Sequence, residues 1–322
     1  MKKNSLAGLL VLLLAPAVLA QQPQRFAPKA LGQDGRITLT PAFAPDGKTI
    51  YFAQSECSPI WECPQTLKTS TLGPAGWSTP EPVKLPRLGR VDWPSVSPDG
   101  SLLLFSWAAP RERHRGKDVY EDFDLYTLKL NEPGARPVPL DDPDINRIRG
   151  SKVRTLRFVN NETAPSLTED GDLYFWTERL DGVGERDVYV ARADGAGGFL
   201  NPKPLPAPIN SPGNDAGAWI SPNGRLMLVN YSDRGGSGGT DIFASTRAGD
   251  QWSKPVNVGG TVNSAFEDFA ARLTPDGRTL VFTSDRPLSG QARGILQVWA
   301  IDVDQIPQLA KLAALATESA GD

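Results

Sequence analysis

The sequence predicts an all-β protein folded as a β-propeller of five four-stranded blades. The 322 residues include 31 glycines and 29 prolines, which indicates many turns. A Pro-Asp-Gly-like turn followed by a strongly apolar strand occurs five times, with turn residues at Asp46, Asp99, Asp170, Asn223 and Asp276. Three of the four spacings between these residues are 53 and the other is 71. A repeat of about 50 residues built from short strands is typical of a propeller blade.

Residues 1–20 are predicted to be a secretory signal peptide. Lys2 and Lys3 precede an unbroken apolar run from Leu9 to Leu14, and small residues at Val18 and Ala20 suit cleavage after Ala20. A retained N-terminal anchor is the alternative. We therefore expect a periplasmic or secreted protein.

Cys57 and Cys63 are the only two cysteines of the sequence. Because an exported compartment permits disulfides, we expect them to pair. Two free thiols are the alternative.

Each repeat contains the signals of four strands. Asp-Gly or Asn-Gly between apolar segments predicts the hairpin that joins the first two strands, because such turns need positive φ. The third strand begins with a polar residue, a spacer and usually an aromatic residue, as at Asp124, Asp187 and Asp241. The fourth follows an aromatic residue and a proline, as at Trp252 and Pro255.

The last repeat lacks a fourth strand, and the missing strand is predicted at the other end of the chain. Residues 26–31 resemble the strand after Trp252 and precede the first repeat without a blade of their own. We therefore expect the mature N-terminus to complete the last blade, which closes the ring and removes exposed edges. Six blades are the alternative, although the extra residues of the second repeat are too few to form one. The propeller then spans residues 21–305, and residues 306–322 form a C-terminal tail, helical or frayed.

The repeats resemble a known family. The runs Ser221-Pro-Asn-Gly224, Ser232-Asp-Arg-Gly-Gly236, Thr274-Pro-Asp-Gly277 and Thr283-Ser-Asp-Arg286 look like tandem WD40-like PD40 repeats. The resemblance covers about residues 25–303 and implies a TolB-like propeller, without the separate N-terminal domain of TolB. It implies a fold and leaves function open, because propellers include both binding modules and enzymes.

An acidic residue recurs seven or eight positions before four of the five turns, at Asp92, Glu162, Asp215 and Asp268. The propeller topology places these residues at the end of the central channel where the loops between strands two and three and between blades gather. Four carboxylates there could hold a cation such as Ca²⁺, or supply the acid and base of a glycosidase. The alternative is that each one caps its own blade through hydrogen bonds to loop amides, and the repetition favours this alternative.

The second repeat departs from the pattern and carries a candidate binding surface. Its inserted loops contain dense positive charge, which includes Arg111, Arg113, His114 and Arg115 in one loop and Arg149 and Arg154 in the other. We interpret them as a docking patch for an anionic partner. The alternative is a solvated insertion balanced by nearby acidic residues. Trp61, between the two cysteines, is a further candidate contact residue, with packing on its own blade as the alternative.

The leading functional prediction is an exported, non-enzymatic propeller that binds a protein or an anionic envelope glycan on its loop face. A single histidine, His114, and the lack of a Gly-x-Ser-x-Gly motif argue against a serine hydrolase. A glycan-active hydrolase or lyase that uses channel carboxylates is the alternative. The net charge of −3 gives no case for nucleic acid. We expect a monomer with no cofactor, with a stabilising Ca²⁺ as an open alternative.

Overall fold

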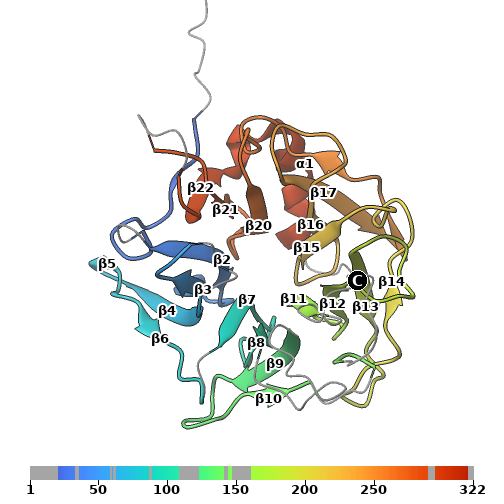
Figure 1. Cartoon of the computed structure of the whole chain (residues 1–322), viewed down its shortest axis with the longest axis horizontal. Coiled ribbons are helices and arrows are strands. Elements are labelled where there is room, and N and C mark those ends of the chain that lie inside the picture. The colour runs from blue at the N-terminus through green and yellow to red at the C-terminus, as the bar shows by residue number, and fades with distance from the viewer. Residues whose placement is uncertain are drawn as a thin grey trace, which may run out of the picture.

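A computed structural model describes residues 21–32, 36–58, 60, 63–86, 89–108, 123–140, 144–146, 161–288 and 294–317. Within these residues the strands form five antiparallel sheets arranged as blades around a central axis (Figure 1). The predicted five-bladed propeller is therefore confirmed. The predicted signal peptide lies outside the described residues.

The strands follow the predicted order, from the innermost to the outermost strand of each blade. Blade one contains β2 (Ile37–Phe43), β3 (Thr49–Ser55), β4 (Thr66–Gly73), β5 (Gly76–Trp77) and β6 (Glu81–Pro82). Blade two contains β7 (Arg90–Val96), β8 (Leu102–Ala108), β9 (Asp124–Lys129) and β10 (Val138–Pro139). Blade three contains β11 (Glu162–Leu167), β12 (Leu173–Thr177), β13 (Asp187–Ala191) and β14 (Lys203–Pro204). Blade four contains β15 (Asp215–Ile220), β16 (Leu226–Tyr231), β17 (Asp241–Ala248), β18 (Gln251–Trp252) and β19 (Val256–Asn257). Blade five contains β20 (Asp268–Leu273), β21 (Thr279–Ser284), β22 (Gln297–Asp302) and, from the other end of the chain, β1 (Gln24–Arg25).

The Asp-Gly turns form because the aspartate side chain fixes the turn that glycine permits. Asp46 Oδ1 accepts hydrogen bonds from the backbone N–H groups of Lys48 and Thr49, at 2.8 and 3.1 Å. Gly47 has φ of 66°, a left-handed conformation that costs glycine little. These turns gather at one end of the channel, which we call the hairpin face. The described loops that join the second strand to the third, or one blade to the next, gather at the opposite end, which we call the loop face.

Every innermost strand carries a β-bulge at the same place. The pairing register with the second strand shifts once in each blade. One residue at each shift has a positive φ: Thr40, Trp93, Ala164, Gly217 and Ala270. A bulge re-aims the residues beside it, so these five positions mark equivalent levels of the five blades.

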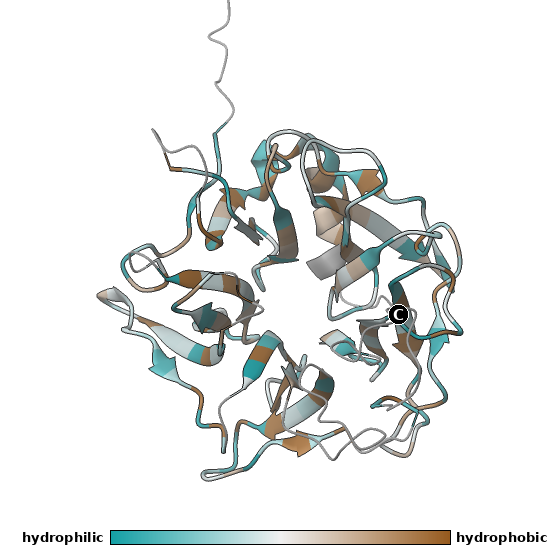
Figure 2. Cartoon of the chain, in the orientation of Figure 1, coloured by the Kyte–Doolittle hydropathy of each residue, from teal (hydrophilic) through white to brown (hydrophobic). Residues whose placement is uncertain are grey.

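The hydrophobic core is divided among the spaces between neighbouring blades. One buried cluster joins Leu67 of blade one to Phe105 of blade two, and further clusters join each successive pair around the ring. In Figure 2 the hydrophobic residues lie mostly in the strands, while many loops around the outside are hydrophilic. Each blade is thus stabilised chiefly by its two neighbours, which favours a closed ring.

The N-terminal segment completes the last blade, as predicted. In β1, Gln24 pairs with Ala300 and Arg25 with Trp299. The strand begins earlier than the expected segment 26–31, which forms a tight turn instead, with Leu31 N donating to Ala27 O at 2.8 Å. Closure of the ring by the N-terminal segment was predicted correctly, but the strand is formed by residues 24–25 and not by residues 26–31.

The chain after the propeller is a packed helix. The 3-10 helix η2 (Val303–Gln305) leads into α1 (Pro307–Thr317). Leu309 and Ala313 of α1 are buried in the cluster between blades four and five, and Asn223 Nδ2 donates to Leu315 O at 2.6 Å. No helix among the described residues is long and apolar enough to cross a bilayer.

Candidate functional site

A pocket of about 860 Å³ occupies the loop-face end of the central channel. We call it the loop pocket. Its walls combine aromatic, amide and charged side chains from four blades, among them Trp93, Trp176, Phe269, Asn214, Asn230 and Glu267. A concave site with apolar walls and a few polar groups is the usual form of a small-ligand site.

Trp93 reaches across the channel and forms part of the pocket wall. Its equivalents at the bulge in the other blades are the smaller residues Thr40, Ala164, Gly217 and Ala270. The indole packs against Phe269 of blade five, with ring centroids 6.2 Å apart. A Cβ added to Gly217 of blade four would lie 2.7 Å from Trp93 Cη2, so glycine is needed there to admit the ring. One large side chain among small ones therefore shapes the pocket.

Two polar atoms of pocket-lining side chains are buried with no hydrogen-bond partner among the described residues. They are Trp176 Nε1, a donor, and Asn230 Oδ1, an acceptor. The Asn230 amide is oriented by its other end, because Nδ2 donates to Gly217 O at 2.7 Å. Buried polar groups in native proteins are usually satisfied, so these two atoms mark unfilled hydrogen-bonding capacity in side chains of the pocket wall.

The loop pocket also carries charge of both signs. The Arg186 guanidinium lies over the Trp176 ring, 5.2 Å from its centroid. Two residues after Trp176, the carboxyl of Glu178 is buried and accepts a hydrogen bond from Asn161 Nδ2 at 2.7 Å. Burial raises the pKa of Glu178, while Arg186 and the bonds from Asn161 oppose that rise. Glu267 adds a carboxylate to the pocket lining, so the site is mixed rather than strongly basic.

Three of the four recurring carboxylates are held in buried ion pairs within their own blades. Arg234 Nη2 lies 3.0 Å from Asp215 Oδ1, and Arg286 Nη2 lies 2.5 Å from Asp268 Oδ1. In blade three the pair is formed by Glu162 with the fully buried Arg179, at 3.1 Å. All three carboxyl side chains are 0% exposed. These three residues therefore fit the alternative in which each one caps its own blade, rather than a cluster of carboxylates shared around the channel.

Loop groups complete the caps of blades four and five. Ser211 donates its hydroxyl to Asp215 at 3.0 Å, and its backbone N–H also donates to that carboxylate. Ser264 does the same for Asp268, at 2.7 Å from Oγ and 2.6 Å from N. Burial raises the pKa of Asp215, and these bonds together with Arg234 oppose the shift. Both carboxylates anchor the interblade loop that precedes their strand.

Asp92 lies one residue nearer to the bulge of its strand than the other three recurring carboxylates do. It lies one residue before the bulge of its blade, whereas Glu162, Asp215 and Asp268 lie two before theirs. Because side chains alternate along a strand, this offset directs Asp92 to another side of the sheet. Its Oδ1 accepts from Thr40 Oγ1 of blade one at 2.6 Å and from Trp93 N at 2.7 Å.

No arginine is paired with Asp92 among the described contacts. Burial raises the pKa of its carboxyl to about 6, against the smaller lowering effects of Thr40, Trp93 N and Arg90. Asp92 is thus buried, at 6% exposed, and directly precedes Trp93 of the loop pocket.

Several predicted site residues lie outside the described residues. These are Trp61, Arg111, Arg113, His114, Arg115, Arg149 and Arg154. Within the described part of the chain, no group of three or more His, Cys, Asp or Glu side chains is arranged to hold a metal ion.

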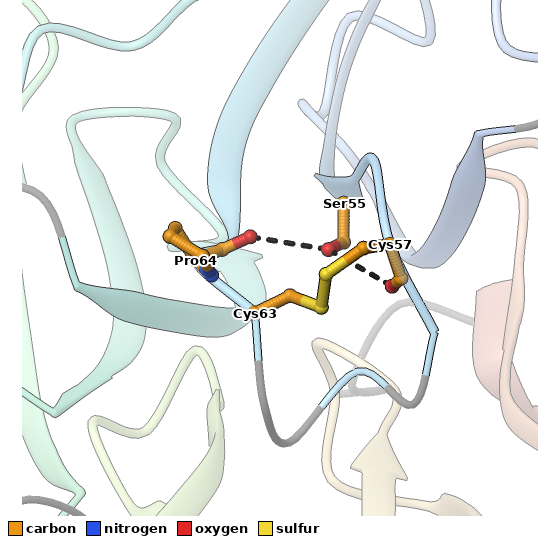
Figure 3. Close-up of a disulfide and its surroundings, with 4 residues drawn as sticks. All are labelled: Ser55, Cys57, Cys63 and Pro64. Atoms are coloured by element: carbon orange, nitrogen blue, oxygen red, sulfur yellow. Dashed lines mark hydrogen bonds between the residues drawn. A yellow bond between two sulfur atoms is a disulfide. The ribbon is translucent and has the colours of Figure 1, made fainter.

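The predicted disulfide is present in the loop after β3. Cys57 and Cys63 are joined, with their Cα atoms 6.0 Å apart. Ser55 Oγ lies 3.1 Å from Pro64 O and 3.4 Å from Cys57 O, so one hydroxyl bridges the two ends of the loop (Figure 3). The bridge fixes a loop whose residues Ser58 and Ile60 line the loop pocket.

Comparison with known proteins gives the fold and leaves the function open. No family model and no curated protein matches the chain. Among solved structures, the α-L-arabinofuranosidase from Lactobacillus brevis is similar with a TM-score of 0.51 and 12% identity, over 85% of this chain and 93% of that one. The GH43_1 enzyme from Xanthomonas citri complexed with xylose has a TM-score of 0.50 and 12% identity, over 85% and 89%. A putative TolB from Agrobacterium tumefaciens has a TM-score of 0.47 and 19% identity, over 84% and 78%.

The expected propeller fold is confirmed by the arrangement of the sheets, and TolB proteins are among the solved structures to which the chain is similar. Sequence analysis missed Trp93 and Trp176 as pocket residues. The signal for Trp93 was present, because an aromatic residue stands where the other repeats carry Thr, Ala or Gly. Nothing comparable singled out Trp176, whose role depends on how the blades face one another.

Proposed function

We propose that this protein is an exported, non-enzymatic binding module that holds part of an envelope partner, protein or anionic glycan, in the loop pocket. The observation that carries the proposal is the pair of unsatisfied polar atoms, Trp176 Nε1 and Asn230 Oδ1, in an aromatic-lined pocket. A sugar hydroxyl or a peptide group has both the acceptor and the donor that these atoms lack, and it would reach them after a small shift of the two side chains. The disulfide supports export, because such bonds persist in oxidising compartments.

The state of the recurring carboxylates supports binding over hydrolysis. A glycosidase needs one carboxyl that gives up a proton and a second that acts as base or nucleophile. Glu162, Asp215 and Asp268 are each paired with an arginine and buried, so none is free to approach a substrate. Arg186 offers one cation to an anionic group of the partner, in a lining that also contains the carboxylates of Glu267 and Asp285. The basic loops around Arg111 and Arg149 stay a prediction that would extend this surface.

The test is retention of envelope components by the immobilised mature protein, followed by affinity measurement with each purified component. Trp176→Ala is expected to weaken binding about 30-fold, since truncation of a buried aromatic contact typically costs about 2 kcal/mol or more. Leu200→Ala is the matched control, because Leu200 is 55% exposed on the outer part of the same blade. Equal affinities for the two variants would contradict the assignment of the pocket.

A glycan-active enzyme is the second candidate, and Asp92 is the observation that favours it. A carboxyl with a pKa of about 6 beside an aromatic-lined pocket has the acidity of a general acid. Incubation of wild type and Asp92→Asn with envelope and plant polysaccharides separates the two functions. Release of reducing sugar by wild type, lost in Asp92→Asn, would establish the enzyme. Binding without release supports the module.

A further inference from the structure

The hairpin-face end of the channel holds a buried arginine that has no counter-ion within the described part of the chain. Arg272 lies on β20, two residues after the bulge, where the other blades carry Ala42, Ser95, Ser166 and Trp219. It is 7% exposed. Its guanidinium has no ion pair or hydrogen bond with any described residue, and Nε is buried without a partner. A charged group so placed is costly unless something else neutralises it.

Arg272 lines a cavity of about 220 Å³, which we call the hairpin cavity. The cavity is distinct from the loop pocket and lies among the residues that precede the Asp-Gly turns. Most of its wall is apolar and rigid, and includes Phe43, Val96, Trp219, Leu273, Pro222 and Pro275. Ser95 contributes a hydroxyl, and the exposed Glu169 contributes a carboxylate.

The charge of Arg272 persists at neutral pH. Burial lowers the pKa of its guanidinium to about 9, and no acidic neighbour raises it. At pH 7 the side chain is therefore still a cation. An anion that entered the cavity would recover the electrostatic energy that the protein itself does not supply.

We propose that the hairpin cavity binds a small organic monoanion, whose carboxylate pairs with Arg272 and whose apolar body packs on Trp219 and the prolines. The planar guanidinium matches a carboxylate in two parallel hydrogen bonds. One guanidinium pairs with one carboxylate, and the exposed Glu169 carboxylate in the cavity lining disfavours the second negative charge of a dianion such as phosphate. The volume admits one ring or one aliphatic side chain, which suits either a free acid or the C-terminal residue of a peptide.

The experiment measures binding of benzoate to the mature protein by thermal shift and by isothermal titration calorimetry. Benzamide, a neutral molecule of the same shape, and inorganic phosphate are tested in parallel. We expect saturable stabilisation by benzoate and at least tenfold weaker binding of benzamide and of phosphate. Equal responses to benzoate and benzamide, equal responses to benzoate and phosphate, or no response to benzoate would overturn the proposal.

Two arginine variants locate the site. Arg272→Met preserves side-chain length without charge and is expected to weaken benzoate binding at least tenfold, while its melting temperature without ligand equals or exceeds that of wild type. Arg278→Met removes an exposed charge from the same hairpin and should bind benzoate as wild type does. Unchanged binding by Arg272→Met would place any anion elsewhere and refute the site.

The source of the carboxylate is distinguished by a peptide series. N-acetyl-Leu-Phe with a free carboxylate is compared with its C-terminal amide. Tighter binding of the acid than of benzoate, with loss in the amide, would assign the cavity to a chain terminus. Binding of benzoate alone would assign it to a free small acid. Either result requires Arg272 and is independent of the loop pocket.

Discussion

Blades three, four and five anchor their loop ends with a buried ion pair, whereas blades one and two are anchored by other means. Thr38 of blade one and Val91 of blade two occupy the position of the paired carboxylates, two residues before the bulge. Blade one instead carries a disulfide in the loop after its second strand. Blade two carries Asp92 one residue further on, with no arginine partner among the described residues. Blades three to five thus show which contacts stabilise a blade, whereas blade two supplies Trp93 and Asp92 to the pocket region.

The largest expected effect comes from breaking one of the regular ion pairs. Arg234→Met leaves the 0%-exposed Asp215 without its cation and removes a hydrogen bond to Pro208 O at 2.6 Å. We expect a loss of about 3–5 kcal/mol in the free energy of unfolding, measured with urea at pH 7.

A double variant tests the cause of that loss. Asp215→Asn/Arg234→Met removes both charges, and should recover about half of the lost stability or more because no uncompensated charge remains. If the double variant is no more stable than Arg234→Met, lost packing rather than an uncompensated charge accounts for the loss of stability.

Asp92→Asn in blade two is expected to act in the opposite direction. In the folded protein the pKa of Asp92 is about 6, above its ordinary value of 3.8, so the folded state binds the proton more tightly than the unfolded state does. Wild type therefore loses stability as pH rises from about 4 to about 6, and stays at that lower level above pH 6. Asparagine cannot ionise and keeps an oxygen for Thr40 and Trp93 N. We expect a gain of about 3 kcal/mol at pH 7, because each pKa unit of the shift is worth about 1.4 kcal/mol.

The pH dependence supplies the control for this prediction. At pH 4 the Asp92 carboxyl is mostly protonated in wild type, so the two proteins should have nearly equal stability. Asp233→Asn, which replaces an exposed carboxylate on the same face, should match wild type at both pH values. A destabilised Asp92→Asn at pH 7 would show that the ionised carboxylate is stabilised by its neighbours.

The sequence predicted the blades because their signals are local. An Asp-Gly turn depends on one aspartate and one glycine, and the closure by β1 followed from counting strands. The position of Asp92 was misjudged. It lies seven residues before its turn, but it was grouped with three residues that lie eight before theirs. A slip of one residue moves a side chain to the other face of a strand. Arg272 and the packing of α1 escaped prediction because both depend on contacts between distant segments.

In blade one the disulfide is expected to supply part of the stability that the buried ion pairs supply in blades three to five. Cys57→Ser/Cys63→Ser frees a short loop, and the chain-entropy estimate for a ring of this size is about 2 kcal/mol. Urea unfolding under non-reducing conditions measures the loss. Addition of reductant to wild type should reproduce it, while the double serine variant should show no response to reductant. Equal stability of the variant and oxidised wild type would mean that Ser55 and the remaining contacts already fix the loop.

The smallest effect is expected for the ion pair on the outside of blade two. Lys129 Nζ lies 3.1 Å from Glu132 Oε2, but their side chains are 68% and 59% exposed. Solvent screens such a pair, and the side chains lose entropy in forming it, so Lys129→Met should change stability by less than about 0.5 kcal/mol. Raising the salt concentration should leave the difference from wild type within the error of the measurement. The contrast with Arg234→Met then compares an exposed with a buried ion pair at about the same distance, where the buried arginine also loses its hydrogen bond to Pro208 O. A loss at Lys129 comparable with that at Arg234 would show that blade two depends on surface charge for the anchoring that its neighbours obtain from buried pairs.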